Sequence, residues 1–183
     1  MKKIIIGALV GGLLIFIWQS LSWTVLDLHR PTQDYTAKQD TILSVLSSNL
    51  TEGGYLMPTV PKGASMDEAM KKSDQSLGKP WAMIQYHASY DATANSMYMN
   101  MLKGFLCCVL IVAFLCWILS RWAKLSFGSV FIASILTGLI VFLNEPYNQH
   151  IWYQSFDIKA HLVDALASWG LCGVWLGWWM KRK

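Results

Sequence analysis

Four long apolar segments alternate with polar ones along this chain. They cover residues 4–23, 104–120, 125–143 and 160–180, and the first contains no charged residue. A helix needs about 20 apolar residues to cross the hydrocarbon core of a bilayer. The pattern therefore predicts an all-α integral membrane protein, built as a bundle of four transmembrane helices.

The segments between the helices predict how they connect. Residues 121–124 form a hinge so short that the second and third helices must be antiparallel, and residues 144–159 form a longer loop. All five prolines lie outside the four apolar segments. Because helices in lipid must satisfy every backbone group internally, uninterrupted segments of this kind are expected to remain helical throughout.

The longest connection, residues 24–103, predicts a small, mostly helical cap between the first two spans. Its first part, residues 34–50, has apolar positions spaced as in an amphipathic helix. Ser65 and Glu68 have the spacing of a capping box, which marks the start of a second helix. Residues 81–86 fit a strand or an extended segment, since periodicity alone does not distinguish the two.

The charges fix an orientation for this arrangement. All eleven acidic residues lie between Asp27 and Asp164, whereas residues 1–3, 121–124 and 181–183 hold seven of the fifteen Lys and Arg residues and no acid. Short loops rich in Lys and Arg stay in the cytoplasm. We therefore expect both termini inside and residues 24–103 and 144–159 outside, which in a bacterial inner membrane is the periplasm.

Composition narrows the class of protein further. With 54% hydrophobic and 14% charged residues, the chain is more apolar than soluble domains, in which about a quarter of residues are charged. Its basic clusters flank hydrophobic segments, so they do not predict nucleic-acid binding, which needs them on one soluble surface. The sequence contains no nucleophile elbow, phosphate loop, zinc-protease or dinucleotide motif. An enzyme is therefore not favoured, and no cofactor is predicted.

Asp164 is the one acid predicted inside an apolar segment. His161, Asp164 and Ser168 follow one another at helical spacings of three and four, so they share one face. A carboxylate within the bilayer is costly and commonly marks an ion or proton site. The alternative is a structural carboxylate that hydrogen-bonds the first span, through Gln19 or Ser20.

A copper site on the outer side is a second chemical possibility. Thioether and imidazole groups suit copper, and the candidate ligands are Met97, Met101, His29 and His87. These residues are widely separated in the sequence, unlike the closely spaced ligands of typical metal motifs.

Small residues recur at spacings that suit close helix contacts. Gly7 and Gly11 are four apart in the first span, and Gly173 and Gly177 are four apart in the fourth. Glycines at this spacing let helix backbones approach closely. They serve either the packing of the four helices or the docking of another membrane subunit.

Three short segments carry a resemblance to a known group of proteins. They are residues 22–29 (SWTVLDLH), 78–82 (GKPWA) and 150–154 (HIWYQ). With them the chain resembles a family of uncharacterised bacterial inner-membrane proteins with four spans. The resemblance implies location in that membrane and carries no activity and no catalytic residue.

These patterns lead to three functional expectations. The first is a non-enzymatic accessory or scaffold subunit of a larger bacterial inner-membrane assembly, whose partners are the lipid bilayer and other membrane subunits. The second is a small transporter or proton-coupled protein that works through His161 and Asp164. The third is a copper-handling protein on the periplasmic side.

Overall fold

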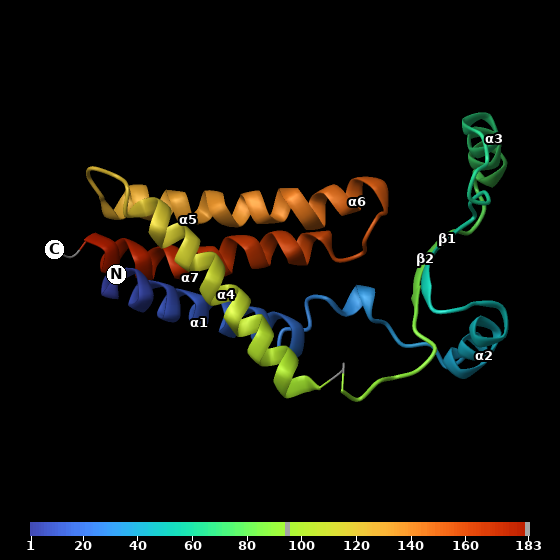
Figure 1. Cartoon of the computed structure of the whole chain (residues 1–183), viewed down its shortest axis with the longest axis horizontal. Coiled ribbons are helices and arrows are strands. Elements are labelled where there is room, and N and C mark those ends of the chain that lie inside the picture. Colours follow the sequence, from blue (N-terminus) through green and yellow to red (C-terminus); the bar gives the residue numbers. More distant parts are fainter. Residues whose placement is uncertain (94–95, 182–183) are drawn as a thin grey trace. The chain divides into compact units, whose positions relative to one another are not determined.

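The computed structural model describes residues 1–93 and 96–181, and these are mostly helical (Figure 1). The chain divides into two compact units. The first combines residues 1–34 with residues 96–183, and the second consists of residues 35–95. We call them the helical unit and the inserted unit.

The helical unit contains four long helices, α1 (Lys2–Thr24), α4 (Met97–Leu119), α5 (Phe127–Phe142) and α7 (Ile158–Lys181). Three helical stretches are long and apolar enough to cross a membrane, namely α1, α4 and the stretch from Phe127 to Trp152. Helix α7 has 24 residues. It falls short of that apolar standard because it contains Asp164 and four tryptophans, which lower its mean hydropathy.

The third apolar helix is longer than its sequence predicted. After α5 the chain continues as a π-helical turn (Leu143–Tyr147) and then as α6 (Asn148–Trp152). The expectation of a loop from residue 144 is therefore wrong for residues 144–152. It assumed that the helix ends before Pro146, whereas Pro146 lies inside the π-helical turn. A wider π turn accommodates a residue that lacks the backbone N–H of the normal helical ladder.

Helices α5, α7 and α1 lie side by side, and α4 crosses them diagonally (Figure 1). Helix α1 packs against α4 on one side and against α7 on the other, and α7 packs against α5. Helices α4 and α5 barely touch each other. Helices α1 and α7 therefore each pack against two neighbours, and buried residues of all four helices share one core.

Glycines lie at the contacts that α1 and α7 make with neighbouring helices. All four glycines singled out in the sequence lie at helix contacts, with other helices near enough to touch an added methyl group: Gly7, Gly11, Gly173 and Gly177. A Cβ atom at Gly11 would lie 2.9 Å from Val112 of α4. One at Gly177 would lie 2.7 Å from Phe127 of α5. The glycines thus pack helices within the chain.

The closest approaches involve two glycines that the spacing pattern did not single out. A Cβ atom at Gly12 would lie 2.6 Å from the Cα of Val109, so α1 and α4 meet backbone to backbone there. A Cβ atom at Gly138 of α5 would lie 2.5 Å from the indole of Trp169 on α7. These contacts leave no room for a side chain on either glycine.

Two tryptophans join α7 to α1 at the end where α1 begins. The indole N–H of Trp179 donates to the backbone oxygen of Lys3 at 2.8 Å, and that of Trp175 donates to the oxygen of Gly7 at 3.2 Å. The two indole rings stack, with centroids 5.3 Å apart. This end of the α1–α7 pair is therefore fixed by side chains that satisfy backbone acceptors.

The inserted unit contains α2 (Gln39–Asn49), β1 (Gly53–Met57), α3 (Met66–Ser76) and β2 (Ala82–Tyr86). The strands pair antiparallel, from Gly53 opposite Tyr86 to Met57 opposite Ala82. The capping box of Ser65 and Glu68 is confirmed at the start of α3. The sequence left β2 undecided and missed β1, because two glycines at its start are untypical of a strand.

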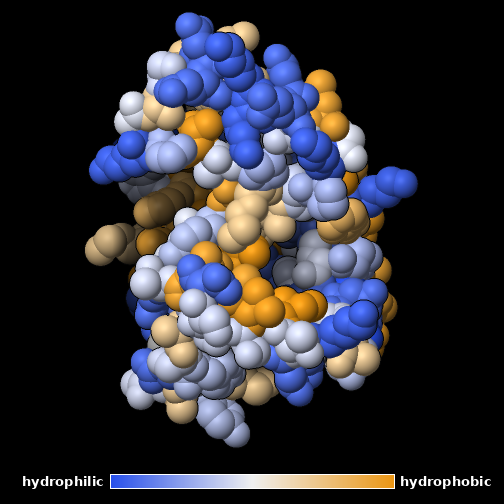
Figure 2. Space-filling model, turned by 90° about the vertical axis from the view of Figure 1, so that its right-hand side faces the viewer, coloured by the Kyte–Doolittle hydropathy of each residue, from blue (hydrophilic) through white to orange (hydrophobic). Residues whose placement is uncertain are grey.

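The inserted unit has almost no core. Within its described part, residues 35–93, Tyr86 is the one buried residue. Polar and charged residues dominate α3, and hydrophilic side chains cover the upper part of Figure 2, where this helix lies. Helix α2 leaves three large apolar side chains exposed, Ile42, Leu43 and Val45.

The glycine contact at the α1–α4 crossing gives a stability prediction. Gly12→Ala forces the two backbones apart, and overpacking of this kind costs about 1–3 kcal/mol. Gly128→Ala is the matched control, because no atom lies within 4 Å of its added Cβ. The free energy of unfolding is measured in mixed micelles by titration with a denaturing detergent. Equal stability of the two variants would contradict the backbone contact.

Candidate functional site

The candidate site lies where α1 ends and α7 begins. It consists of His29, Asp157, His161 and Asp164, which we call the His–Asp cluster. His29 is in the loop after α1, Asp157 directly precedes α7, and His161 and Asp164 are on its first turns. His29 is 2% exposed and Asp157 is 5% exposed, so the cluster is buried at its centre.

The loop after α1 folds back on the helix and so presents His29 to α7. The backbone N–H of Leu28 donates to the oxygen of Ser22 at 3.0 Å. The reversal uses a left-handed conformation at Asp27, with φ of 50°, which Asp adopts more readily than most residues. Just after His29, a short 3-10 turn (Arg30–Thr32) begins and holds the His29 backbone by a bond from Thr32 N–H at 3.1 Å.

Both ring nitrogens of His29 face carboxylates. Its Nδ1 lies 2.7 Å from Oδ2 of Asp157, and its Nε2 lies 2.9 Å from Oδ2 of Asp164. A neutral imidazole has one N–H and can donate to one of the two. To satisfy both contacts, the imidazole must carry a proton on each nitrogen, or one carboxyl group must be protonated, or a metal cation must take the place of one proton.

Asp164 uses both of its oxygens. The indole N–H of Trp18 on α1 donates to Oδ1 at 2.9 Å, and His29 occupies Oδ2. The sequence placed Gln19 or Ser20 of α1 in this role. The partner is Trp18 instead, because the side-chain oxygen of Gln19 accepts from Cys108 and the hydroxyl of Ser20 donates to the backbone of its own helix.

Asp157 gathers its contacts on a single oxygen. Oδ2 accepts from His29 and lies 3.3 Å from Nε2 of His161 and 3.4 Å from the hydroxyl of Thr32. Burial raises the pKa of this carboxyl, but the hydrogen bond with His29 and the positive charges of His161 and His29 outweigh it. The net pKa lies below the ordinary 3.8, so the group is a carboxylate near neutral pH.

Aromatic rings hold the plane of the His29 imidazole. The indole of Trp23 stacks on it with centroids 3.9 Å apart and planes 4° from parallel. The ring of His161 approaches edge-on at 4.7 Å. A stacked, doubly hydrogen-bonded imidazole has little freedom to turn, so its two nitrogens stay aimed at the two carboxylates.

Three of the four residues offer ligand atoms for a metal ion. Nδ1 or Nε2 of each histidine and a carboxylate oxygen of Asp157 lie within 4.8 Å of one another. Of the parts of the chain that the structure describes, this is the one group of three or more His, Cys, Asp and Glu side chains with such spacing.

The residues predicted from sequence divide between this cluster and other places. His161 and Asp164 both belong to it, joined through His29 and Asp157, whereas Ser168 contributes only a hydroxyl bond to the backbone of Asp164 at 2.6 Å. The signal that marks Asp157 is its spacing of four from His161, the same spacing that places two ligands on one face of a helix.

The proposed copper ligands belong to both units of the chain. His29 lies in the His–Asp cluster of the helical unit, and His87 pairs with Glu52 in the inserted unit at 3.3 Å, with both side chains largely exposed. Met97 and Met101 begin α4 with side chains 69% and 43% exposed.

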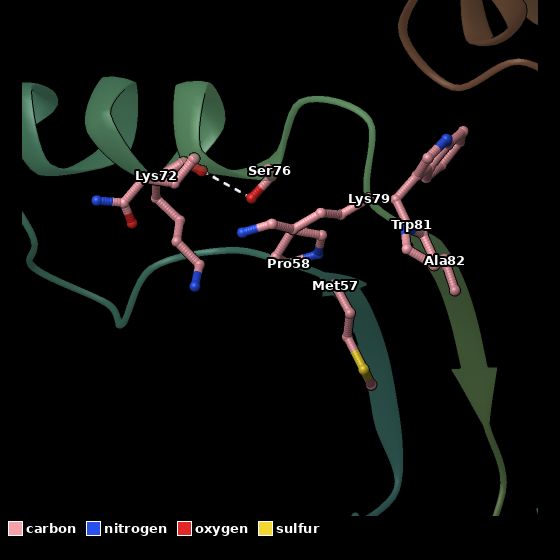
Figure 3. Close-up of a pocket in the computed structure, with 9 residues that line it drawn as sticks. Met57, Pro58, Lys72, Ser76, Lys79, Trp81 and Ala82 are labelled. Atoms are coloured by element: carbon pink, nitrogen blue, oxygen red, sulfur yellow. Dashed lines mark hydrogen bonds between the residues drawn. The ribbon is translucent and has the colours of Figure 1, made fainter.

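A pocket in the inserted unit is the alternative place to look for chemistry. It has a volume of about 390 Å³ and lies beside α3 and the paired ends of β1 and β2, with Lys72, Lys79 and Trp81 among its lining residues (Figure 3). Its lining contains no acid, histidine or cysteine. Apart from the thioether of Met57 it offers no side chain typical of a metal site, and the His–Asp cluster is the stronger candidate.

Comparison with known proteins adds no assignment: no family model, no curated protein and no solved structure matches this chain.

Removal of the central imidazole gives a test of the geometry. His29→Ala leaves the two carboxylates of Asp157 and Asp164 without their shared partner, and breaking a buried pair in this way costs about 3–5 kcal/mol. His87→Ala removes a histidine from an exposed pair and is the matched control. We expect no measurable change for it. Equal free energies of unfolding in detergent for the two variants would contradict the bridging role of His29.

Proposed function

We propose that this protein is a cation-handling membrane protein, a small transporter or a cation-coupled protein that works through the His–Asp cluster. The observation that carries the proposal is the buried imidazole of His29 between two carboxylates. Ionisable residues among membrane helices are costly and mark ion or proton sites by default. The proposal refines the sequence-based expectation for His161 and Asp164 by adding His29 and Asp157.

The charge of the cluster supports a cation as its ligand. Two carboxylates give it two negative charges, and their ion pairs, among the residues described, are with histidines alone. The nearest basic residue in the sequence, Arg30, pairs instead with Asp27 and Asp34. No fixed positive charge therefore neutralises the cluster, and a bound cation has the sign to do so.

The membrane topology belongs to the same proposal. We take α7 as a fourth span, both termini as cytoplasmic, and the inserted unit as periplasmic in a bacterial inner membrane. The support is the position of the basic residues, which flank the ends of α1 and α7 opposite the cluster and the turn between α4 and α5. With this topology, the cluster lies at the outer edge of the membrane, where cations arrive from water.

Cation movement across a vesicle membrane tests the proposal. The full chain is reconstituted in liposomes, and influx is followed with fluorescent indicators for H⁺, K⁺ and Zn²⁺ in turn. We expect influx of at least one cation above that of empty liposomes. Asp164→Asn removes one charge of the cluster at nearly constant shape and should lower this influx at least tenfold.

His87→Ala is the control, because His87 lies in the inserted unit outside the cluster. It should leave the influx unchanged. Reconstituted wild-type protein that moves no cation, or an Asp164→Asn variant as active as the wild type, would refute the proposed function.

An accessory subunit is a second candidate, and one observation favours it. Helix α2 has no buried residue, and its apolar side chains Ile42, Leu43 and Val45 are about half exposed. An amphipathic helix that leaves its apolar positions uncovered is typical of a surface that binds another protein. The near-absence of a core in the inserted unit agrees with stabilisation by a partner.

Co-purification separates this candidate from the first. We expect a defined partner to accompany the wild-type protein in mild detergent and to be lost from a Leu43→Glu/Val45→Glu variant. Lys71→Glu/Lys72→Glu on α3 is the control, since it changes charge on a polar helix of the same unit. A wild-type protein that purifies alone as a monomer would count against an accessory role.

A further inference from the structure

We propose that the cation of the His–Asp cluster is a divalent transition-metal ion of the zinc type, bound by His29, Asp157 and His161 and held in place by Asp164 and Trp18 behind them. This inference rests on the proposed function, because it names the ion that the cluster would handle.

The spacing of the three ligand atoms fits such an ion. Oδ2 of Asp157 lies 2.7 Å from Nδ1 of His29 and 3.3 Å from Nε2 of His161. Bonds of about 2.0–2.1 Å in a tetrahedral zinc site place neighbouring ligand atoms about 3.3 Å apart. The pair of Asp157 and His161 already has this separation. The pair of Asp157 and His29 must widen by roughly 0.6 Å, which replacement of its hydrogen bond by a metal ion would bring about. The ligand nitrogens of the two imidazoles lie within 4.8 Å of each other.

The far side of His29 has the partner that metal-binding histidines require. A histidine ligand usually donates its second ring N–H to a carboxylate, which fixes the tautomer and the ring orientation. Nε2 of His29 lies 2.9 Å from Asp164, and the Asp164 carboxylate is itself oriented by the indole N–H of Trp18. A proton on Nε2 leaves the lone pair of Nδ1 free, on the side where Asp157 and His161 lie.

The two carboxylates therefore have different roles, one as a metal ligand and one as the group that orients His29. Asp164 has both oxygens engaged by Trp18 and His29 and serves as the orienting group. The contacts of Asp157 all involve Oδ2, the atom closest to both imidazoles. With Asp157 and Asp164 ionised and both histidines neutral, a divalent ion brings the charge of the cluster to zero.

The ligand set indicates the class of metal. Two imidazoles and one carboxylate suit Zn²⁺ and neighbouring first-row divalent ions, whereas thioether and thiolate ligands are those that select Cu(I). The three side chains leave a fourth coordination position for water or an exchangeable ligand. His161 has a side chain 31% exposed, so the cluster is accessible to solvent on its side.

Metal titration of the purified full-length protein tests this inference. After treatment with a chelator, the protein in detergent is titrated with Zn²⁺ in competition with a chromophoric zinc indicator, and with Co²⁺ followed by its visible absorption. We expect one ion per chain and the intense Co²⁺ spectrum of a four-coordinate site. Asp157→Asn and His161→Ala should weaken binding at least a hundredfold, and Asp164→Asn by about 10- to 100-fold because it acts through His29.

Two controls keep the outcome interpretable. His87→Ala and His150→Ala remove histidines outside the cluster and should bind Zn²⁺ as the wild type does. His161 is part-exposed, so its variant is expected to fold, and circular dichroism with gel filtration verifies this for every variant. A wild-type protein without stoichiometric binding, or equal affinity in the wild type and a folded His161→Ala variant, would overturn the inference.

Failure of the metal site and failure of the proposed function give different results. If the protein binds no metal but Asp164→Asn still abolishes the influx of another cation, the inference is wrong and the proposed function stands. If Zn²⁺ binds at the cluster but no cation crosses the liposome membrane, the metal site stands and the transport function is wrong.

Discussion

The hydrogen bonds of the His29 imidazole with two carboxylates hold the end of α1 to the start of α7. They join a loop after α1 to the beginning of α7, across 128 and 135 positions of sequence. Ionisable groups in a buried setting are stable only when each has its partner, and removal of one leaves the others uncompensated. Apolar residues of similar volume would often serve stability as well. Stability alone therefore does not explain why charged groups occupy these positions.

The rest of the helical unit holds this cluster in a fixed geometry. Between the ends of α1 and α7, glycines allow the helices to pack closely on their neighbours. At one end the pair is joined by the bond from Trp179 to Lys3, and at the cluster end by the bond from Trp18 to Asp164. His161 and Asp164 lie on α7, and His29 and Asp157 lie next to the ends of helices that are joined at both ends, which helps to hold these side chains in position.

The sequence predicted the apolar helices and two members of the cluster, His161 and Asp164, because both produce local signals. A run of apolar residues identifies a span, and Asp164 is conspicuous as an acid within such a run. His29 gives no such signal, because its position depends on a left-handed turn at Asp27 and on contacts more than a hundred residues away. Spacing of four relates Asp157 to His161, but only the folded chain shows that His29 completes the set.

Which helices pack against each other was not predictable from their apolarity, for a related reason. In a membrane protein, the residues that face lipid and those that face another helix are both apolar, so hydropathy does not identify which helices are in contact. Close packing is decided by small residues, and the decisive ones here, Gly12 and Gly138, fall outside the four-residue spacing of the recognised pairs. The close contacts of α1 with α7 are instead at Gly7 and Gly11, on the same helix pair that Trp18 and Asp164 join by a hydrogen bond. The α1–α7 pair thus takes part both in close packing and in the chemistry of the cluster.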